Sequence, residues 1–129
     1  MKKIILLVSS CVLLLMNACV QKEHAKTVTF QVDMTQEPAV KQVGLKGQFT
    51  IPSWEVTIPM TDEDGDGIYE VTLTEMTAQS STRFKFVKGD EEMELACKPN
   101  RSLEFTYQPE TIRYTAIFNV ENGIQKTLN

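Results

Sequence analysis

Residues 28–34 read Val28-Thr29-Phe30-Gln31-Val32-Asp33-Met34, and apolar and polar side chains alternate through the whole stretch. Successive side chains of a β-strand point to opposite faces, so a period of two predicts a strand with one buried face and one wet face. A helix would instead place apolar residues three or four positions apart. This stretch therefore decides in favour of a β fold.

The same alternation recurs along the rest of the chain, and turn-forming residues such as Pro, Gly and Asp separate the runs. Further strands are predicted around residues 43–45, 56–60, 69–73, 84–86, 93–97, 103–107 and 112–118. No stretch after residue 19 has a convincing helical period. The pattern predicts an all-β fold, an immunoglobulin-like antiparallel β-sandwich of about seven or eight strands.

The first 18 residues have a different character. Lys2 and Lys3 precede an apolar stretch that runs to Met16, and Asn17 and Ala18 then lead to Cys19. A positive start, a short apolar run and small residues before the cut predict a secretory signal, because a membrane-spanning helix needs about 20 apolar residues. The segment resembles a bacterial lipoprotein signal, in which the Cys at the position of Cys19 is acylated, for example with palmitate.

These features predict three parts. We expect a signal peptide at residues 1–18, a lipidated Cys19 with a polar tether at residues 19–26, and a single β-sandwich domain at residues 27–129. The protein is then expected in the cell envelope, held at the outer membrane by its lipid anchor and facing either the periplasm or the cell surface. The only histidine, His24, falls in the tether, so a multi-histidine metal site or a histidine-dependent triad is not expected.

Charge narrows the range of partners. Removing residues 1–18 takes away Lys2 and Lys3 and no acidic residue, so 11 basic residues remain against 17 acidic ones. A nucleic-acid partner is not expected, because binding to phosphates needs a basic face.

Several short elements occur in a recognisable order. Gly44-Leu45-Lys46-Gly47 is followed by Trp54, and Phe84-Lys85-Phe86 is followed by Glu94 and then by Asn100-Arg101. Together they resemble a starch-binding module of the glucoamylase type and the related immunoglobulin-like carbohydrate-binding modules. The resemblance covers most of residues 27–107.

The resemblance implies a set of sugar-binding residues. Trp54 would be the aromatic platform, Lys85 a donor to sugar hydroxyls, Glu94 an acceptor and Asn100 a further polar contact. The division is physically sound, since the C–H face of a sugar suits an aromatic ring and its hydroxyls need convergent polar groups. Met93 stands where the resemblance puts a second Trp, and a thioether chain stacks less well than a ring.

Each of these residues also has a structural interpretation. Trp54 shares parity with Val56, so it could be a buried core residue instead of a platform. Alternation points Lys85 and Glu94 outward, which suits either a solvated face or a sugar contact. Asn100 follows a proline and could cap a turn. Cys97 alternates with Met93, and we expect a buried thiol there.

The acidic stretch Asp62-Glu63-Asp64-Gly65-Asp66-Gly67 is similar to the start of an EF-hand loop. Carboxylates at positions 1, 3 and 5 suit calcium, but position 12 is Leu73 and not the required glutamate. An Asp/Gly turn between two strands is favoured. No cofactor is expected, and Asp62, Asp64 and Asp66 are the calcium candidates if a metal binds.

No motif of an enzyme is evident. A glycosidase needs two carboxylates across a cleft, and a nucleophile elbow, a phosphate loop and a zinc signature are absent from the sequence. The sequence therefore predicts a non-catalytic, lipid-anchored module that binds an oligosaccharide or polysaccharide of the starch or α-glucan kind. The alternative is a structural or protein–protein interaction β-sandwich of an envelope complex that binds no sugar.

Overall fold

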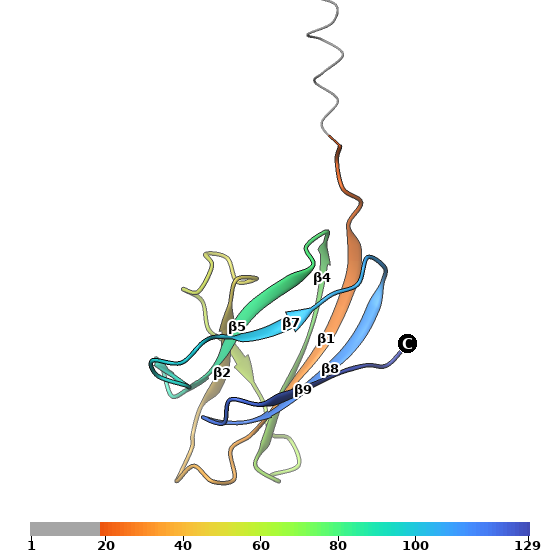
Figure 1. The fold of residues 1–129 in the computed structure, drawn as a ribbon. Helices are drawn as coiled ribbons and strands as arrows, with labels where there is room; N and C mark the ends of the chain where they lie inside the picture. The colour runs from red at the N-terminus through yellow and green to blue at the C-terminus, as the bar shows by residue number, and fades with distance from the viewer. Residues whose placement is uncertain (1–18) are drawn as a thin grey trace, which may run out of the picture.

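The computed structural model describes residues 19–129, and the predicted signal peptide lies outside the described residues. Nine strands form two sheets, which confirms the predicted all-β sandwich (Figure 1). The strands are β1 (His24–Asp33), β2 (Val43–Gly47), β3 (Ile58–Met60), β4 (Ile68–Thr77), β5 (Ser81–Lys88), β6 (Glu92–Met93), β7 (Arg101–Glu104), β8 (Glu110–Ile117) and β9 (Gly123–Thr127). Within residues 19–129, no helix long and apolar enough to cross a membrane is present.

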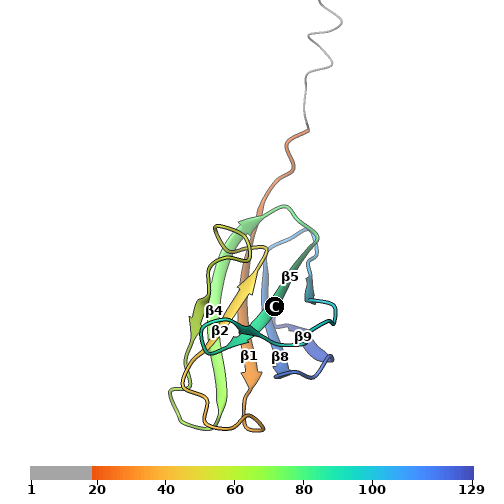
Figure 2. The ribbon, with the colours of Figure 1, turned by 90° about the vertical axis from the view of Figure 1, so that its left-hand side faces the viewer.

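One sheet has the strand order β4-β1-β8-β9 and the other has the order β3-β2-β5-β6, with β7 also paired to β5. In Figure 2, β2 and β5 lie in front of β1 and β8, so the two layers can be followed. All pairs are antiparallel except β1 and β8, which run parallel. The predicted sandwich was purely antiparallel, so this parallel pairing of the first strand with the eighth is a difference. It joins the two ends of the chain into one sheet.

The alternation of β1 matches the prediction. Val28, Phe30, Val32 and Met34 are all buried, with at most 5% exposure, whereas the residues between them contact solvent. In the register of β1 and β8, Val28 pairs with Ile112 and Phe30 pairs with Tyr114. The same face of the sheet is therefore apolar on both strands. The period of two in the sequence therefore identifies the core side of this sheet.

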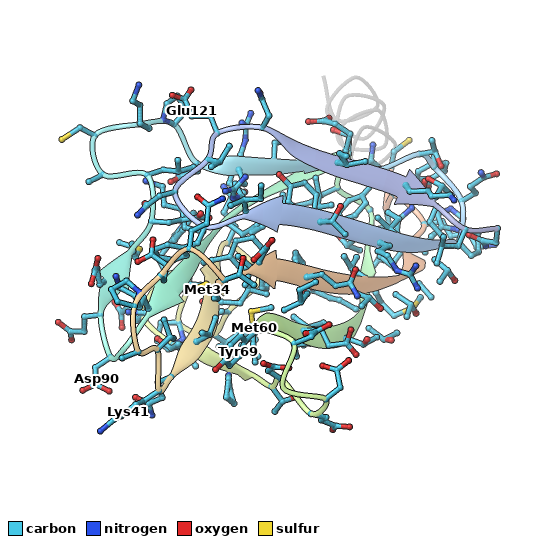
Figure 3. The ribbon with its side chains drawn as sticks, turned by 90° about the horizontal axis from the view of Figure 1, so that it is seen from below. Met34, Lys41, Met60, Tyr69, Asp90 and Glu121 are labelled. Atoms are coloured by element: carbon cyan, nitrogen blue, oxygen red, sulfur yellow. The ribbon has the colours of Figure 1, made fainter. Side chains whose placement is uncertain are left out.

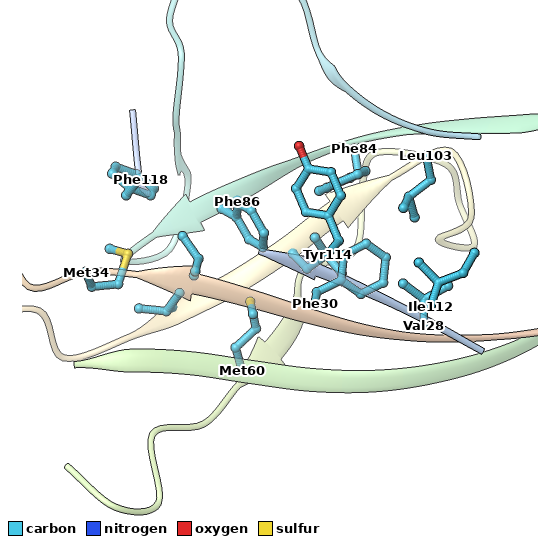
Figure 4. Close-up of a cluster of buried hydrophobic side chains, with 13 residues drawn as sticks. Val28, Phe30, Met34, Met60, Phe84, Phe86, Leu103, Ile112, Tyr114 and Phe118 are labelled. Carbon is cyan, nitrogen blue, oxygen red and sulfur yellow. The ribbon is translucent and has the colours of Figure 1, made fainter. Parts of the chain in front are cut away.

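The core is a cluster of aromatic and aliphatic side chains between the sheets (Figure 4). The Phe84 ring lies 5.0 Å from the rings of both Phe30 and Tyr114, in edge-to-face geometry. Such pairs add about 1 kcal/mol each to the hydrophobic burial. At the far end from the start of β1, Met34 and Met60 point between the sheets, while Lys41, Asp90 and Glu121 lie on outer loops (Figure 3).

The strand boundaries correct part of the sequence interpretation. β1 begins at His24, three residues before the expected domain start at residue 27, and the His24 ring packs edge-on against Tyr107 at 4.6 Å. Residues 93–97 form no strand beyond Met93. Val56 lies outside any strand and is 41% exposed. The last residues do form an edge strand, β9.

A buried ion pair closes the sandwich where β1 and β8 begin. Lys26 Nζ lies 2.6 Å from Glu110 Oε2, and both side chains are 3% exposed. The ammonium group also donates to the carbonyl oxygens of Thr106 and Gln108. Burial alone would raise the pKa of Glu110, but hydrogen bonds from Lys26 and Thr106 outweigh it and lower that pKa. Lys26, the third residue of β1, can face the core because each of its three ammonium protons has an acceptor.

Replacing Glu110 by Gln is expected to lower the free energy of unfolding at pH 7 by about 3 kcal/mol, since Lys26 loses its counter-charge in a buried site. The native pKa is depressed, so the contribution of Glu110 is present above roughly pH 4.3, the ordinary pKa of a glutamate. It is lost as the pH falls through the native pKa. Urea unfolding at pH 7 and at pH 3 should therefore show the gap between wild type and Glu110→Gln narrowing in acid.

The exposed pair Lys98–Glu121, with side chains 55% and 57% exposed, offers the control. Glu121→Gln should change stability by less than about 1 kcal/mol. If the difference in free energy of unfolding between wild type and Glu110→Gln stayed constant between pH 7 and pH 3, the stabilising role of the Glu110 carboxylate would be contradicted.

Candidate functional site

Trp54 lies on the β2–β3 loop, whose conformation is stabilised by hydrogen bonds of the backbone and of the Thr50 side chain. Its N–H is shared between the Gly47 carbonyl at 3.0 Å and the hydroxyl oxygen of Thr50 at 2.9 Å. The Thr50 hydroxyl is buried and lies 2.9 Å from the Gly47 carbonyl and 3.0 Å from the Pro52 carbonyl. Trp54 itself has a φ of 66°, a conformation that costs a non-glycine residue of order 1 kcal/mol and needs such support.

The indole side chain of Trp54 is half-buried and takes no part in the core cluster. Simple alternation from Val56 would have pointed Trp54 inward, but residues 51–55 form bends and turns. Trp54 therefore lies outside any strand, and alternation with Val56 does not determine where its side chain points. Of the two interpretations that the sequence left open, burial in the core is wrong, and the platform role stays a prediction.

The loop that carries Trp54 also forms one wall of a pocket between the sheets, of about 330 Å³. Core side chains make its floor, and polar residues from β4, the β4–β5 turn and β5 stand around it. The lining residues are Lys26, Val28, Phe30, Gln48, Phe49, Ser53, Leu73, Glu75, Thr77, Gln79, Thr82, Leu103 and Phe105. The start of β1 and the β4–β5 turn, which both contribute lining residues, lie at the upper end of the domain in Figure 1.

Sequence reasoning missed this pocket. Phe49 is a lone aromatic residue in a loop, Thr82 precedes the strand predicted at 84–86, and Phe105 belongs to the strand predicted at 103–107. Only the register brings them together, because Thr82 of β5 pairs with Leu103 of β7. Phe49, a phenylalanine two residues after β2 and outside any alternating run, is the one signal that could have marked the wall.

Lys85 is not on an open face. Alternation correctly points it away from Phe84 and Phe86, but the β6–β7 loop folds back over this face of the sheet. Lys85 is 8% exposed, and Nζ donates to the carbonyls of Leu95 at 2.8 Å and Lys98 at 3.2 Å. The neighbouring outward residue Val87 is fully buried. The expected outward lysine therefore fastens a loop in the described structure.

Glu94 was expected to face outward and that orientation is wrong, because its side chain is 0% exposed. Oε1 accepts from Arg101 Nε at 2.6 Å and from the Phe86 N–H at 3.0 Å. Oε2 accepts from Arg101 Nη2 at 2.8 Å and from the Asn119 N–H at 3.2 Å. Both carboxylate oxygens are thus fully occupied inside the protein.

Arg101 completes the same network. Its Nη2 also donates to the carbonyl of Ile117, the last residue of β8, at 3.1 Å and to the carbonyl of Val120, in the β8–β9 connection, at 2.7 Å. Burial alone would lower the pKa of Arg101, but the hydrogen bonds and charge of Glu94 outweigh it, so the pKa is raised. The guanidinium therefore stays charged and joins β7 to the opposite sheet.

Asn100 and Met93 are exposed, Met93 by 45%. Gly47 of β2 and Arg101 of β7 both pair with Phe84, on opposite sides of β5. Gly47 accepts the Trp54 N–H, and Asn100 directly precedes Arg101. Strands are spaced by about 4.8 Å, so the two flanking strands are about 10 Å apart at this level. Gly47 and Arg101 thus lie on either side of Phe84, and the next residue of β5, Lys85, is covered by the loop.

Cys97 was expected to be buried, and it is exposed. Leu95 and Cys97 have φ values of 51° and 60°, so the backbone turns left-handed at both positions. A strand cannot continue through such residues. The same two residues explain why alternation misjudged the orientation of Glu94.

The acidic stretch forms the predicted connection between β3 and β4. Oxygen atoms of Asp62, Asp64 and Asp66 lie within 4.8 Å of one another. Carboxylates of this loop accept backbone N–H bonds, for example from Gly67 to Asp62 at 2.8 Å and from Ile68 to Asp66 at 2.8 Å. With one oxygen from each carboxylate, the group would supply three of the six to eight oxygen ligands that calcium takes.

No protein-family model matches the chain, and no curated protein matches it in sequence. A solved structure does match in fold: the solution structure of CBM25-2 of the beta/alpha-amylase from Paenibacillus polymyxa. The TM-score is 0.50 at 17% sequence identity, and the match covers 82% of this chain and 95% of that module. The β-sandwich that the family resemblance implied is therefore the fold of this chain.

Glu94→Gln is expected to lower the free energy of unfolding by about 3 kcal/mol or more, because it leaves the Arg101 charge buried without its partner. If Glu94 only supports the loop, the folded variant should bind maltoheptaose with unchanged affinity. Thermal unfolding and isothermal titration on the same sample check both points. A variant of normal stability that has lost affinity would contradict the structural role and restore the sugar-contact role.

Proposed function

We propose that this domain binds a neutral glycan of the α-glucan kind without catalysing a reaction. The observation that carries the proposal is Trp54, an indole kept outside the core on a loop that four hydrogen bonds hold in place. An aromatic residue in this setting stabilises no core, and its ring is rigid enough to stack on the C–H face of a sugar.

The surroundings of Trp54 supply the other half of a sugar site. Gln48 and Ser53, on the same loop, and Gln79, on the β4–β5 turn, line the adjacent pocket with polar side chains. Amide and hydroxyl groups both donate and accept hydrogen bonds, which sugar hydroxyls need for orientation. The fold agrees with this function, since the name of the similar structure, CBM25-2, abbreviates a carbohydrate-binding module of an amylase.

The site proposed here differs from the one the family resemblance implied. Trp54 and Asn100 remain accessible, whereas the polar atoms of Lys85 and Glu94 are engaged inside the protein. Binding is therefore assigned to the β2–β3 loop and the β4–β5 turn, with Asn100 as an outlying contact.

Trp54→Ala should weaken the binding of maltoheptaose by about tenfold or more, because it removes the stacking face. Titration of the protein starting at residue 19, with serine in place of Cys19, measures this by heat and by tryptophan fluorescence. Ile124→Ser, a change of an exposed apolar residue on the opposite sheet, is the matched control. No binding of wild type to maltoheptaose or to a broader glycan panel would reject the proposal.

We also propose that the domain is anchored in the cell envelope by a lipid on Cys19, at the outer membrane. Cys19 is exposed, and only four residues, 20–23, lie between it and His24, where β1 begins. Such a segment spans at most about 18 Å when extended. Gln21 shares a hollow with Gln79 and Ser81, so the tether leaves the domain beside the β4–β5 turn. The anchor and the proposed glycan site therefore lie at the same end of the domain.

Cys19→Ser should move the full-length protein from the membrane fraction to the soluble fraction of cells, and incorporation of labelled palmitate should be lost. The Trp54→Ala variant serves as the control and should remain in the membrane fraction. Equal membrane retention of Cys19→Ser and wild type would contradict the anchor.

One observation favours a second function, that of a protein-interaction module. Ile68, Ile117 and Ile124 are exposed and line a hollow of about 300 Å³ on the outer face of the four-stranded sheet. A partner in an envelope complex could cover these side chains without any sugar. In that case Ile124→Ser would reduce co-purification of a cross-linked envelope protein, while Trp54→Ala would have no effect in any assay.

A further inference from the structure

The pocket between the sheets has a closed floor. Val28, Phe30 and Leu103 lie at its bottom and are themselves core residues with at most 5% exposure. The Phe30 ring also lies 5.7 Å from the Phe49 ring, so the wall from the β2–β3 loop is packed onto the floor. A glycan chain cannot run through a recess that ends in the core, and only the end of a chain could enter.

The size of the pocket leads to the same conclusion. Its volume of about 330 Å³ lies at the lower end of the range of roughly 300–1,000 Å³ for small-molecule sites. That space suits one ring, not several consecutive rings. Aromatic side chains, Phe49 and Phe105, stand on its wall, and the hydroxyls of Thr77 and Thr82 and the amides of Gln48 and Gln79 provide hydrogen-bonding groups.

The charges around the pocket select a neutral ligand. Lys26 lines it, but its ammonium donates to Thr106, Gln108 and Glu110, so all three of its protons are used. Glu75 adds a carboxylate at the pocket, and partial burial, together with the nearby Glu23, raises the pKa of Glu75. An anionic group would therefore find no free cation here and would face a like charge.

We propose that this pocket receives the terminal ring of a neutral glycan, so that the domain recognises chain ends in preference to internal segments. This inference rests on the proposed glycan-binding function and adds a second contact region to it. Trp54, on the same loop as Phe49 and Ser53, would then stack on a ring outside the pocket. The inference names the class of ligand, a linear neutral oligosaccharide with a free end.

A pair of ligands tests the inference directly. Maltoheptaose and cyclomaltoheptaose contain the same seven glucose units, but the cyclic form has no chain end. Isothermal titration of the protein that starts at residue 19, with Cys19→Ser, should show at least tenfold tighter binding of the linear form. Maltose, which also has chain ends, should compete with maltoheptaose.

Two threonine variants locate the effect. Thr82→Val keeps the shape of a residue that is 8% exposed and removes its hydroxyl from the pocket. It should weaken maltoheptaose binding about three- to tenfold while leaving residual cyclomaltoheptaose binding unchanged. Thr115→Val, the same change on the outer face of β8, is the control and should alter neither. Circular dichroism and thermal unfolding establish that both variants are folded.

The possible outcomes separate the two proposals. Equal affinities for the linear and cyclic forms, both lost in Trp54→Ala, would overturn chain-end recognition and leave glycan binding intact. An unchanged maltoheptaose affinity in folded Thr82→Val would also overturn it. No binding of either ligand by wild type would overturn this inference together with the proposed function.

Discussion

The buried ion pair between Glu94 and Arg101 is the interaction on which the shape of the accessible surface depends. Burying a carboxylate and a guanidinium away from water costs free energy. That cost is offset only if both oxygens and most of the N–H donors find hydrogen-bond partners. Here the carboxylate accepts four hydrogen bonds and the guanidinium reaches the β8–β9 connection. Residues 94–101 must follow a path that satisfies both groups, and that path runs across the outer face of β5.

This path has a direct consequence for function. The β6–β7 loop covers Lys85 and Val87, and it offers its carbonyls to the Lys85 ammonium. The face on which the family resemblance placed Lys85 as a sugar contact is therefore covered by the chain itself. At the start of β8, the Lys26–Glu110 pair closes the sandwich in the same way but leaves the pocket under the β2–β3 loop open. The two buried ion pairs thus direct the proposed ligand to the end that carries Trp54.

Much of the fold follows from the sequence, because β1 and β8 bury alternate residues and a period of two is hard to mistake. The loops could not be predicted in this way. Leu95 and Cys97 adopt positive φ values without being glycines, and this local reversal misplaced Glu94 and Cys97. Lys26 and Arg101 are charged residues that face inward, which composition alone does not reveal. The pocket arises from register between strands far apart in the sequence, and no single motif encodes it.

The central claim is that the ligand binds beside Trp54 and not on the face covered by residues 94–100. Amide chemical-shift mapping of the nitrogen-labelled protein starting at residue 19, with Cys19→Ser, during titration with maltoheptaose, tests it most directly. The account predicts the largest shifts at Gln48, Trp54, Gln79 and Thr82, with Glu94 and Asn119 unmoved. Shifts centred on Lys85, Glu94 and Asn119, with Gln79 and Thr82 unmoved, would contradict it.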